Sequence, residues 1–107
     1  MTEKVKPSIT WISEQFTKSE KVLVSGEGDI RSRMYFAVPW IYWFDPGAIP
    51  DEQLRKKIVI FRQDLEGKYA SFTEAIKARR FSTLSKLAVR ISNLNDEVHG
   101  LTRTLSR

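Results

Sequence analysis

Seven apolar residues near the C-terminal end of the chain recur at alternating steps of three and four, and this seam is the strongest constraint on the fold. They are Leu84, Leu87, Ile91, Leu94, Val98, Leu101 and Leu105. Such steps place side chains on one stripe of an α-helix, and uninterrupted heptads are typical of a helix that packs along a partner helix. Two partners are open: a helix from Leu54 to Leu65 of the same chain, or the same segment of a second chain. We favour the second and predict a homodimeric coiled coil with an interface formed by Leu84, Leu87, Ile91, Leu94, Val98 and Leu101.

A second helix is predicted before this seam, and a third helix is predicted to start ahead of the seam and to carry it. Pro50, Asp51 and Glu52 are typical of a helix start, because proline suits the first turn and carboxylates favour the positive end of the helix dipole. Apolar residues then follow at helical spacing up to a glycine that is typical of a helix end: Leu54, Ile58, Phe61, Leu65 and Gly67. Ser71-Phe72-Thr73-Glu74 matches a capping box and predicts another helix start. The apolar stripe nearly continues through this region, so one bent helix over residues 51–106 stays an alternative to a hairpin.

The first fifty residues carry a mixed pattern. Ser8 is a suitable N-cap for a short helix with Ile9, Ile12 and Phe16 on one side. The β-branched segment 21–24, the glycine-containing reversal 25–29 and the alternating segment 30–38 together predict a β-hairpin. Pro39 would interrupt a strand, so residues 40–44 are expected to form an edge strand, a bent continuation or an ordered loop.

These elements predict an α+β fold class. A short N-terminal helix and a β-hairpin are followed by two or three long C-terminal helices, which form an antiparallel or dimeric helical bundle. One domain is expected over residues 1–107, with an α-β-β portion at 1–50 that holds the aromatic cluster and a basic helical portion at 51–107. A chain of 107 residues is close to the usual size of a single domain.

The residue inventory excludes several classes of chemistry. The chain has no cysteine and a single histidine, His99, so disulfides, thiolate metal sites and cysteine nucleophiles are excluded. We predict a protein that is not an enzyme and has no cofactor or metal ion. The longest apolar run, residues 34–44, is shorter than the roughly 20 residues of a membrane span. Residues 1–7 lack the apolar core of a secretory signal, which predicts a cytoplasmic or nuclear, intracellular location without membrane contact.

Positive charge is concentrated in the second half of the chain. Residues 1–54 carry 6 basic and 8 acidic side chains, whereas residues 55–107 carry 12 basic and 5 acidic ones. Arg79, Lys86 and Arg90 share one helix face over about 16 Å, which matches several phosphates along a duplex. We therefore predict a dimeric protein that grips the phosphate backbone of duplex DNA or RNA. The predicted contacts are Arg55, Lys56, Arg62, Lys77, Arg79, Arg80, Lys86 and Arg90. The alternative is that these side chains cover helix surfaces and pair with Asp64, Glu66 and Glu74.

Half of the aromatic residues fall within ten positions. They are Tyr35, Phe36, Trp40, Tyr42, Trp43 and Phe44. The favoured interpretation is that they form the main core. They could instead form an exposed docking patch, because tryptophan and tyrosine are frequent anchors of protein interfaces. That alternative describes an adaptor or inhibitor that binds a protein partner through the aromatic segment or the heptad helix.

Overall fold

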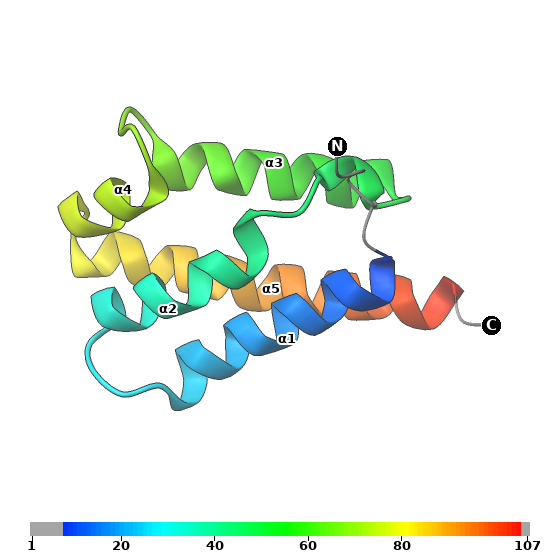
Figure 1. Cartoon of the computed structure of the whole chain (residues 1–107), viewed down its shortest axis with the longest axis horizontal. Helices are drawn as coiled ribbons and strands as arrows, with labels where there is room; N and C mark the ends of the chain where they lie inside the picture. The colour runs from blue at the N-terminus through cyan, green and yellow to red at the C-terminus, as the bar shows by residue number, and fades with distance from the viewer. Residues whose placement is uncertain (1–7, 106–107) are drawn as a thin grey trace, which may run out of the picture.

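A computed structural model describes residues 8–105 and forms five α-helices and one short 3₁₀ helix in that range (Figure 1). The elements are α1 (Ile9–Ser25), α2 (Ile30–Tyr42), η1 (Pro46–Ala48), α3 (Glu52–Glu66), α4 (Phe72–Ala78) and α5 (Phe81–Leu105). Helix α5 runs along most of the molecule, whose longest dimension is 40 Å, and packs against α1, α2 and α3. The segment that predicts the cellular location, residues 1–7, lies outside the described residues.

Short polar side chains begin four of the helices, because each accepts a hydrogen bond from a backbone amide of the first turn. The predicted starts at Ser8, Asp51 and Ser71 are confirmed, since these side chains bond the first turns of α1, α3 and α4. The predicted end at Gly67 is also confirmed, and its positive φ of 54° suits glycine. One bent helix over residues 51–106 is wrong, and so is a third helix that runs unbroken from Ser71 through the seam, because the chain leaves helical geometry after α3 and again between α4 and α5. Arg79 is the C-cap of α4 and therefore does not share a helix face with Lys86 and Arg90 of α5.

The predicted β-hairpin and the α+β class are wrong, because residues 8–105 contain no strand. The segment 21–24 forms the last turns of α1, and residues 30–38 belong to α2, which Asp29 caps. The buried residues of α2 follow helical spacing: Met34, Ala37, Val38 and Ile41. Phe36, which the alternating pattern placed on the same side as Met34, is exposed.

Pro39 lies inside α2 and does not end it. The helix continues to Tyr42, so the predicted edge strand or loop over residues 40–44 is instead the last turn of α2 and the bend that follows. Proline has no amide proton, and therefore the ring nitrogen cannot donate to the carbonyl of Tyr35. The helix ends within one turn of this missing bond.

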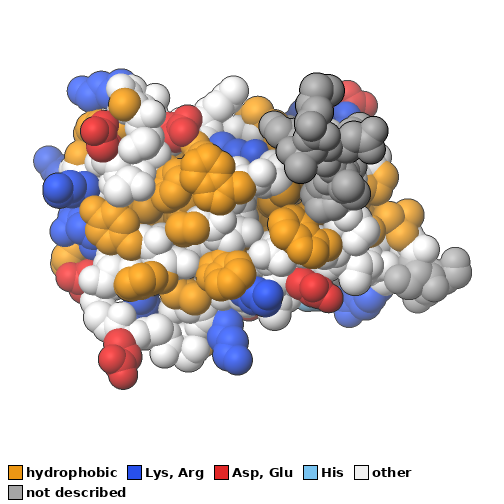
Figure 2. Space-filling model, in the orientation of Figure 1, with side chains coloured by type: hydrophobic (Ala, Val, Ile, Leu, Met, Phe, Trp, Pro, Cys, Tyr) orange, Lys and Arg blue, Asp and Glu red, His pale blue; other side chains and the backbone are white. Residues whose placement is uncertain are grey.

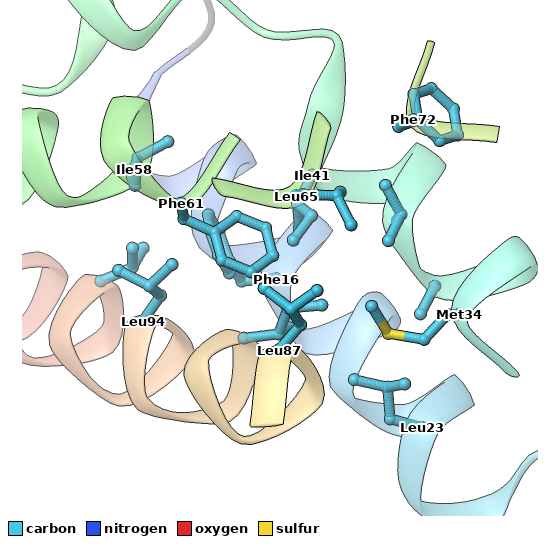
Figure 3. Packing of buried hydrophobic residues seen from close by; sticks show 14 of the residues in the cluster. Phe16, Leu23, Met34, Ile41, Ile58, Phe61, Leu65, Phe72, Leu87 and Leu94 are labelled. Atoms are coloured by element: carbon cyan, nitrogen blue, oxygen red, sulfur yellow. The ribbon is translucent and has the colours of Figure 1, made fainter. Parts of the chain in front are cut away.

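One cluster of buried hydrophobic side chains has members from all five α-helices (Figure 3). Helix α5 supplies five residues of the heptad seam: Leu84, Leu87, Ile91, Leu94 and Val98. Figure 3 shows Leu87 and Leu94 pointing toward the side on which Phe16 of α1 and Phe61 of α3 lie. The seam is therefore filled by helices of the same chain, with α1 as a partner in addition to α3.

Candidate functional site

Arg62, one of the predicted phosphate contacts, binds backbone carbonyl groups at the end of α2. Its Nη2 donates to the carbonyl oxygens of Ile41 at 3.1 Å and Phe44 at 3.0 Å. The guanidinium also lies over the rings of Tyr42 and Phe44. Burial lowers the pKa of Arg62. The last carbonyls of a helix lack partners within the helix and carry partial negative charge, so a guanidinium group at this position satisfies and stabilises them.

Arg79 and Arg55 make the same kind of contact elsewhere in the chain. Arg79 donates from Nε to the carbonyl oxygen of Leu65 at 3.0 Å and from Nη2 to that of Asp64 at 2.7 Å, at the end of α3. Arg55 donates from Nε and Nη2 to the carbonyl oxygen of Ile49, directly after η1. Donors that are used in this way are not free to bind a phosphate.

Two arginines outside the set of predicted phosphate contacts complete this pattern. Arg33 donates to the carbonyl of Leu23 at the end of α1 and to that of Gly28 in the turn that follows, and Arg31 donates to two carbonyls at the end of α4. Each of the helices α1 to α4 thus has an arginine from a different element at its C-terminal end. One sequence signal was available, because α1, α2 and α3 have no basic residue of their own in the last turn.

The other predicted phosphate contacts divide into paired and unpaired side chains. Arg90 binds Oδ2 of Asp64 at 2.9 Å, and Lys56 lies 3.4 Å from Glu52 in an exposed pair. Within the described residues, the side chains of Lys77, Arg80 and Lys86 are exposed and make no hydrogen bond or ion pair.

The predicted phosphate contacts do not form one continuous surface. The three unpaired residues lie near one end of the molecule: Lys77 on α4, Arg80 just after it and Lys86 on the first turns of α5. Figure 2 shows a group of basic side chains at this end. Lys56 lies near the start of α3, at the opposite end of that helix from α4. The two ends of the expected basic surface are therefore separated by the length of α3.

The side chains that were predicted to join two chains lie in the core of one chain. Leu84, Leu87, Ile91, Leu94 and Val98 are buried, and Leu101 is partly buried against the same cluster. They pack in a bundle in which α5 contacts α1, α2 and α3. The five buried residues of the seam are therefore not presented to a second copy in this structure, whereas Leu105 at the end of α5 is exposed.

The aromatic segment is divided between the core and the surface. Phe44 is buried and Tyr35 and Tyr42 are half-buried, which agrees in part with the core interpretation. The side chains of Phe36, Trp40 and Trp43 instead remain 69%, 41% and 74% exposed. We call these three residues the aromatic ridge. Their spacing of four and three residues places them along one side of α2 and its C-cap, and Figure 2 shows hydrophobic side chains gathered on this face.

A groove of about 610 Å³ lies between α1 and α2 next to the aromatic ridge. We call it the α1–α2 groove. Its apolar lining includes Val22, Phe36 and Trp40, and its α1 side carries Lys18 and Lys21. The Nζ of Lys18 lies 4.9 Å from the centre of the Trp40 ring, which is a cation–π contact.

The described residues hold no cluster that is typical of a metal centre. Over residues 8–105 no group of three or more His, Asp or Glu side chains could hold a metal ion. His99 lies on α5, and its ring nitrogens contact the Asn95 carbonyl of the same helix at 2.8 Å and the Thr17 hydroxyl of α1 at 3.1 Å. None of the helices in this range has both the length and the apolar character needed to cross a bilayer.

Comparisons of this chain with protein-family models, with curated proteins and with solved structures found no match. Its function is therefore inferred from the surfaces described above.

Proposed function

We propose that this protein is a non-enzymatic interaction protein that binds a protein partner through the aromatic ridge. The exposure of Phe36 and Trp43, both more than two thirds accessible on one face of α2, carries this proposal. It takes up the second of the two functions that the sequence left open, an adaptor or inhibitor that uses its aromatic segment. We propose that this binding takes place in the cytoplasm or nucleus.

The physical reason is the free energy of hydration of these rings. Burying apolar surface is favourable by roughly 25 cal/mol per Å². A partner that covers these exposed rings would therefore gain binding free energy. Single exposed apolar residues are common on protein surfaces, whereas aligned large aromatic side chains are typical of interfaces. The ridge also lies beside a groove, so a partner could contact both the rings and the recess between α1 and α2.

The test uses the folded full chain as bait in an extract of the cells that express it, followed by titration of the purified partner. A variant with Phe36→Ser and Trp43→Ser should weaken the affinity at least about tenfold, because truncation of interface aromatics commonly costs about 2 kcal/mol or more. The matched control has Ile60→Ser and Val89→Ser, which change exposed apolar residues on α3 and α5.

Both variants should stay folded, because all four side chains are exposed. The ridge variant also loses the ring contacts of Trp43 with Tyr42 and Phe72, so its melting temperature should fall slightly below that of the control variant. Partner binding that survives in the ridge variant, or falls equally in the control variant, would contradict the proposal. So would the absence of any saturable protein partner for the wild-type chain.

Nucleic-acid binding is the second candidate function, and the unpaired side chains of Lys77, Arg80 and Lys86 favour it. Three cations without an acidic partner are available to phosphates, and they would bind without reading the bases. Short DNA and RNA duplexes should then bind at low salt and lose affinity steeply as salt is added. Arg80→Glu with Lys86→Glu should abolish this binding, while Lys56→Glu at the far end of α3 should not. No binding to any duplex at low salt would contradict this candidate.

A further inference from the structure

We propose that the α1–α2 groove binds an amphipathic helix of the partner protein, with an apolar side in the groove and carboxylates along the edge that faces α1. This inference depends on the proposed function, because it specifies the chemistry of the partner at the aromatic ridge. Apolar anchors at spacings of three and four residues on a helix are a common way to fill a hydrophobic groove.

The dimensions of the surface suit a helix. Phe36 and Trp43 are seven residues apart on α2 and its cap, which corresponds to about 10 Å along the helix axis. Two turns of a partner helix cover the same length, and its anchors at positions i, i+4 and i+7 have this same spacing. Phe36 and Trp40 also line the groove, so these two residues of the ridge form part of its α2 wall, and Trp43 lies one turn beyond Trp40.

The charges around the groove favour an acidic occupant. Lys18 and Lys21 are three residues apart on α1, so they lie on the same side of that helix and both border the groove. Lys18 contacts the face of Trp40 and has no ion pair, and the side chain of Lys21 has no ion pair within the described residues. Arg33 adds a third positive charge, and Glu27 is the acidic residue of the lining.

A second copy of this chain fits the groove less well than an acidic helix. A symmetric contact places the same patch of each copy against the other, which brings the lysine pair of one copy close to that of the next. Both copies would also carry the net charge of +5. Like charges that face each other across an interface lower the affinity, whereas carboxylates placed there raise both the affinity and the rate of association.

The experiment selects helices against the folded protein and then exchanges the charges. A displayed library of amphipathic helices of about four turns carries a fixed apolar stripe and random residues at both edges. Selection on the wild-type chain should enrich acidic residues at one edge. The most enriched peptide, labelled with a fluorophore, is then titrated against the wild type and two variants. One variant has Lys18→Glu and Lys21→Glu, and the control has Lys56→Glu on α3.

We expect the double charge reversal to weaken binding of the acidic peptide by about tenfold or more, and the control to leave it unchanged. A matched peptide with lysines in place of the acidic residues should bind the reversed variant better than the wild type. Both lysines are exposed, so the variants should keep the wild-type melting temperature.

Three outcomes would overturn the inference. They are the enrichment of neutral or basic edges, the enrichment of no helix at all, and affinity for the acidic peptide that survives the charge reversal. Vesicles of phosphatidylcholine and phosphatidylserine serve as a further probe, and ridge-dependent binding to vesicles without selection of any helix would assign the surface to a lipid interface instead. If the peptide results fail while the Phe36 and Trp43 variant still loses its protein partner, the acidic-helix inference falls and the proposed function stands.

Discussion

Replacement of Ile91 by alanine tests whether the heptad seam closes the core of a single chain. Ile91 is fully buried in α5 and belongs to the cluster that joins all five helices. The change removes three carbon atoms, worth about 2.5 kcal/mol at about 0.8 kcal/mol per buried methylene. The cavity that remains adds to this, so we expect a loss of about 3 to 4 kcal/mol in the free energy of unfolding. A small domain has only about 5–15 kcal/mol in total, so the variant should fold with a much lower urea midpoint.

The assay is urea unfolding at two protein concentrations about tenfold apart, together with sedimentation equilibrium. If the seam packs within one chain, the urea midpoint of Ile91→Ala should be the same at both protein concentrations, because mass action affects only associating chains. The wild type and the variant should also have the same mass in solution. Val89→Ala is the matched control, since Val89 lies on the same helix and is 59% exposed, and it should change stability by less than about 0.5 kcal/mol. A wild-type dimer that Ile91→Ala converts to a monomer would refute the reasoning, as would a loss below about 1 kcal/mol.

Three other changes test the helix ends. Arg62→Met keeps the aliphatic stem but removes the donors to the end of α2, and should lower the free energy of urea unfolding by about 1.5–3 kcal/mol. The Ser32 amide holds the pKa of Asp29 below its ordinary value of 3.8, so the charged form stabilises the fold at neutral pH. The stability difference between wild type and Asp29→Ala in thermal melts should therefore shrink as the pH falls below 3.8, through the lowered folded-state pKa. Gly67→Ala should lower the free energy of unfolding by more than about 1 kcal/mol, because φ is +54° and a Cβ atom would lie 2.7 Å from an arginine nitrogen. Gly100 lies within α5 with open space around it, so Gly100→Ala should raise the free energy of unfolding by about 0.5–1 kcal/mol.

Each of these changes has a control and a contradicting outcome. Lys56→Met on the exposed face of α3 should stay within about 0.5 kcal/mol of the wild type, and an equal loss at Arg62 and Lys56 would refute the carbonyl contacts. Asp29→Asn is the control for pH, because it keeps an oxygen acceptor but has no titratable charge. If the stability difference between Asp29→Asn and Asp29→Ala still varied with pH, the pH dependence could not be assigned to the Asp29 carboxylate. Equal effects of alanine at the two glycines would contradict their different backbone geometries.

The helices of the second half of the chain were predictable because their signals are local. A hydroxyl or carboxylate three residues before the amide that it binds, as at Asp51 and Ser71, is a property of one turn of chain. The apolar stripe of α5 likewise depends only on spacing. The partners of that stripe are not local, since α1 and α3 are both far from α5 in the sequence. This is why the buried side was predicted and the homodimer was favoured over packing within the chain.

The error at α2 has a specific physical origin. Ile30, Met34 and Val38 are separated by four residues, and this spacing satisfies both an alternating strand pattern and one side of a helix. Ala37 and Ile41 decide for the helix, because they are buried with Met34 and Val38 and do not fit the alternation. Pro39 led to the expectation that the element ends there and that residues 40–44 form a separate strand or loop, although a proline near the C-terminal end of a helix costs only one backbone hydrogen bond.

The candidate site could be predicted only in part. The aromatic density of residues 35–44 was visible, and a docking patch was one of the interpretations that it allowed. Which of these rings is buried depends on the side of α2 that faces α1 and α5, and this is set by tertiary packing. The same holds for Arg62 and Arg79, whose carbonyl acceptors become neighbours only when the helices pack.

The arginines at the helix ends also affect how the molecule opens. The last turn of an isolated helix frays easily, because nothing outside the helix holds its terminal carbonyls. Here such a turn can open only if the hydrogen bonds from an arginine of a different element break. The opening of one helix end is therefore coupled to the packing of the neighbouring element. Amide hydrogen exchange should accordingly show protection that extends to the ends of α1, α2 and α3. Most amides should exchange through the cooperative opening of several elements together and few through local fraying.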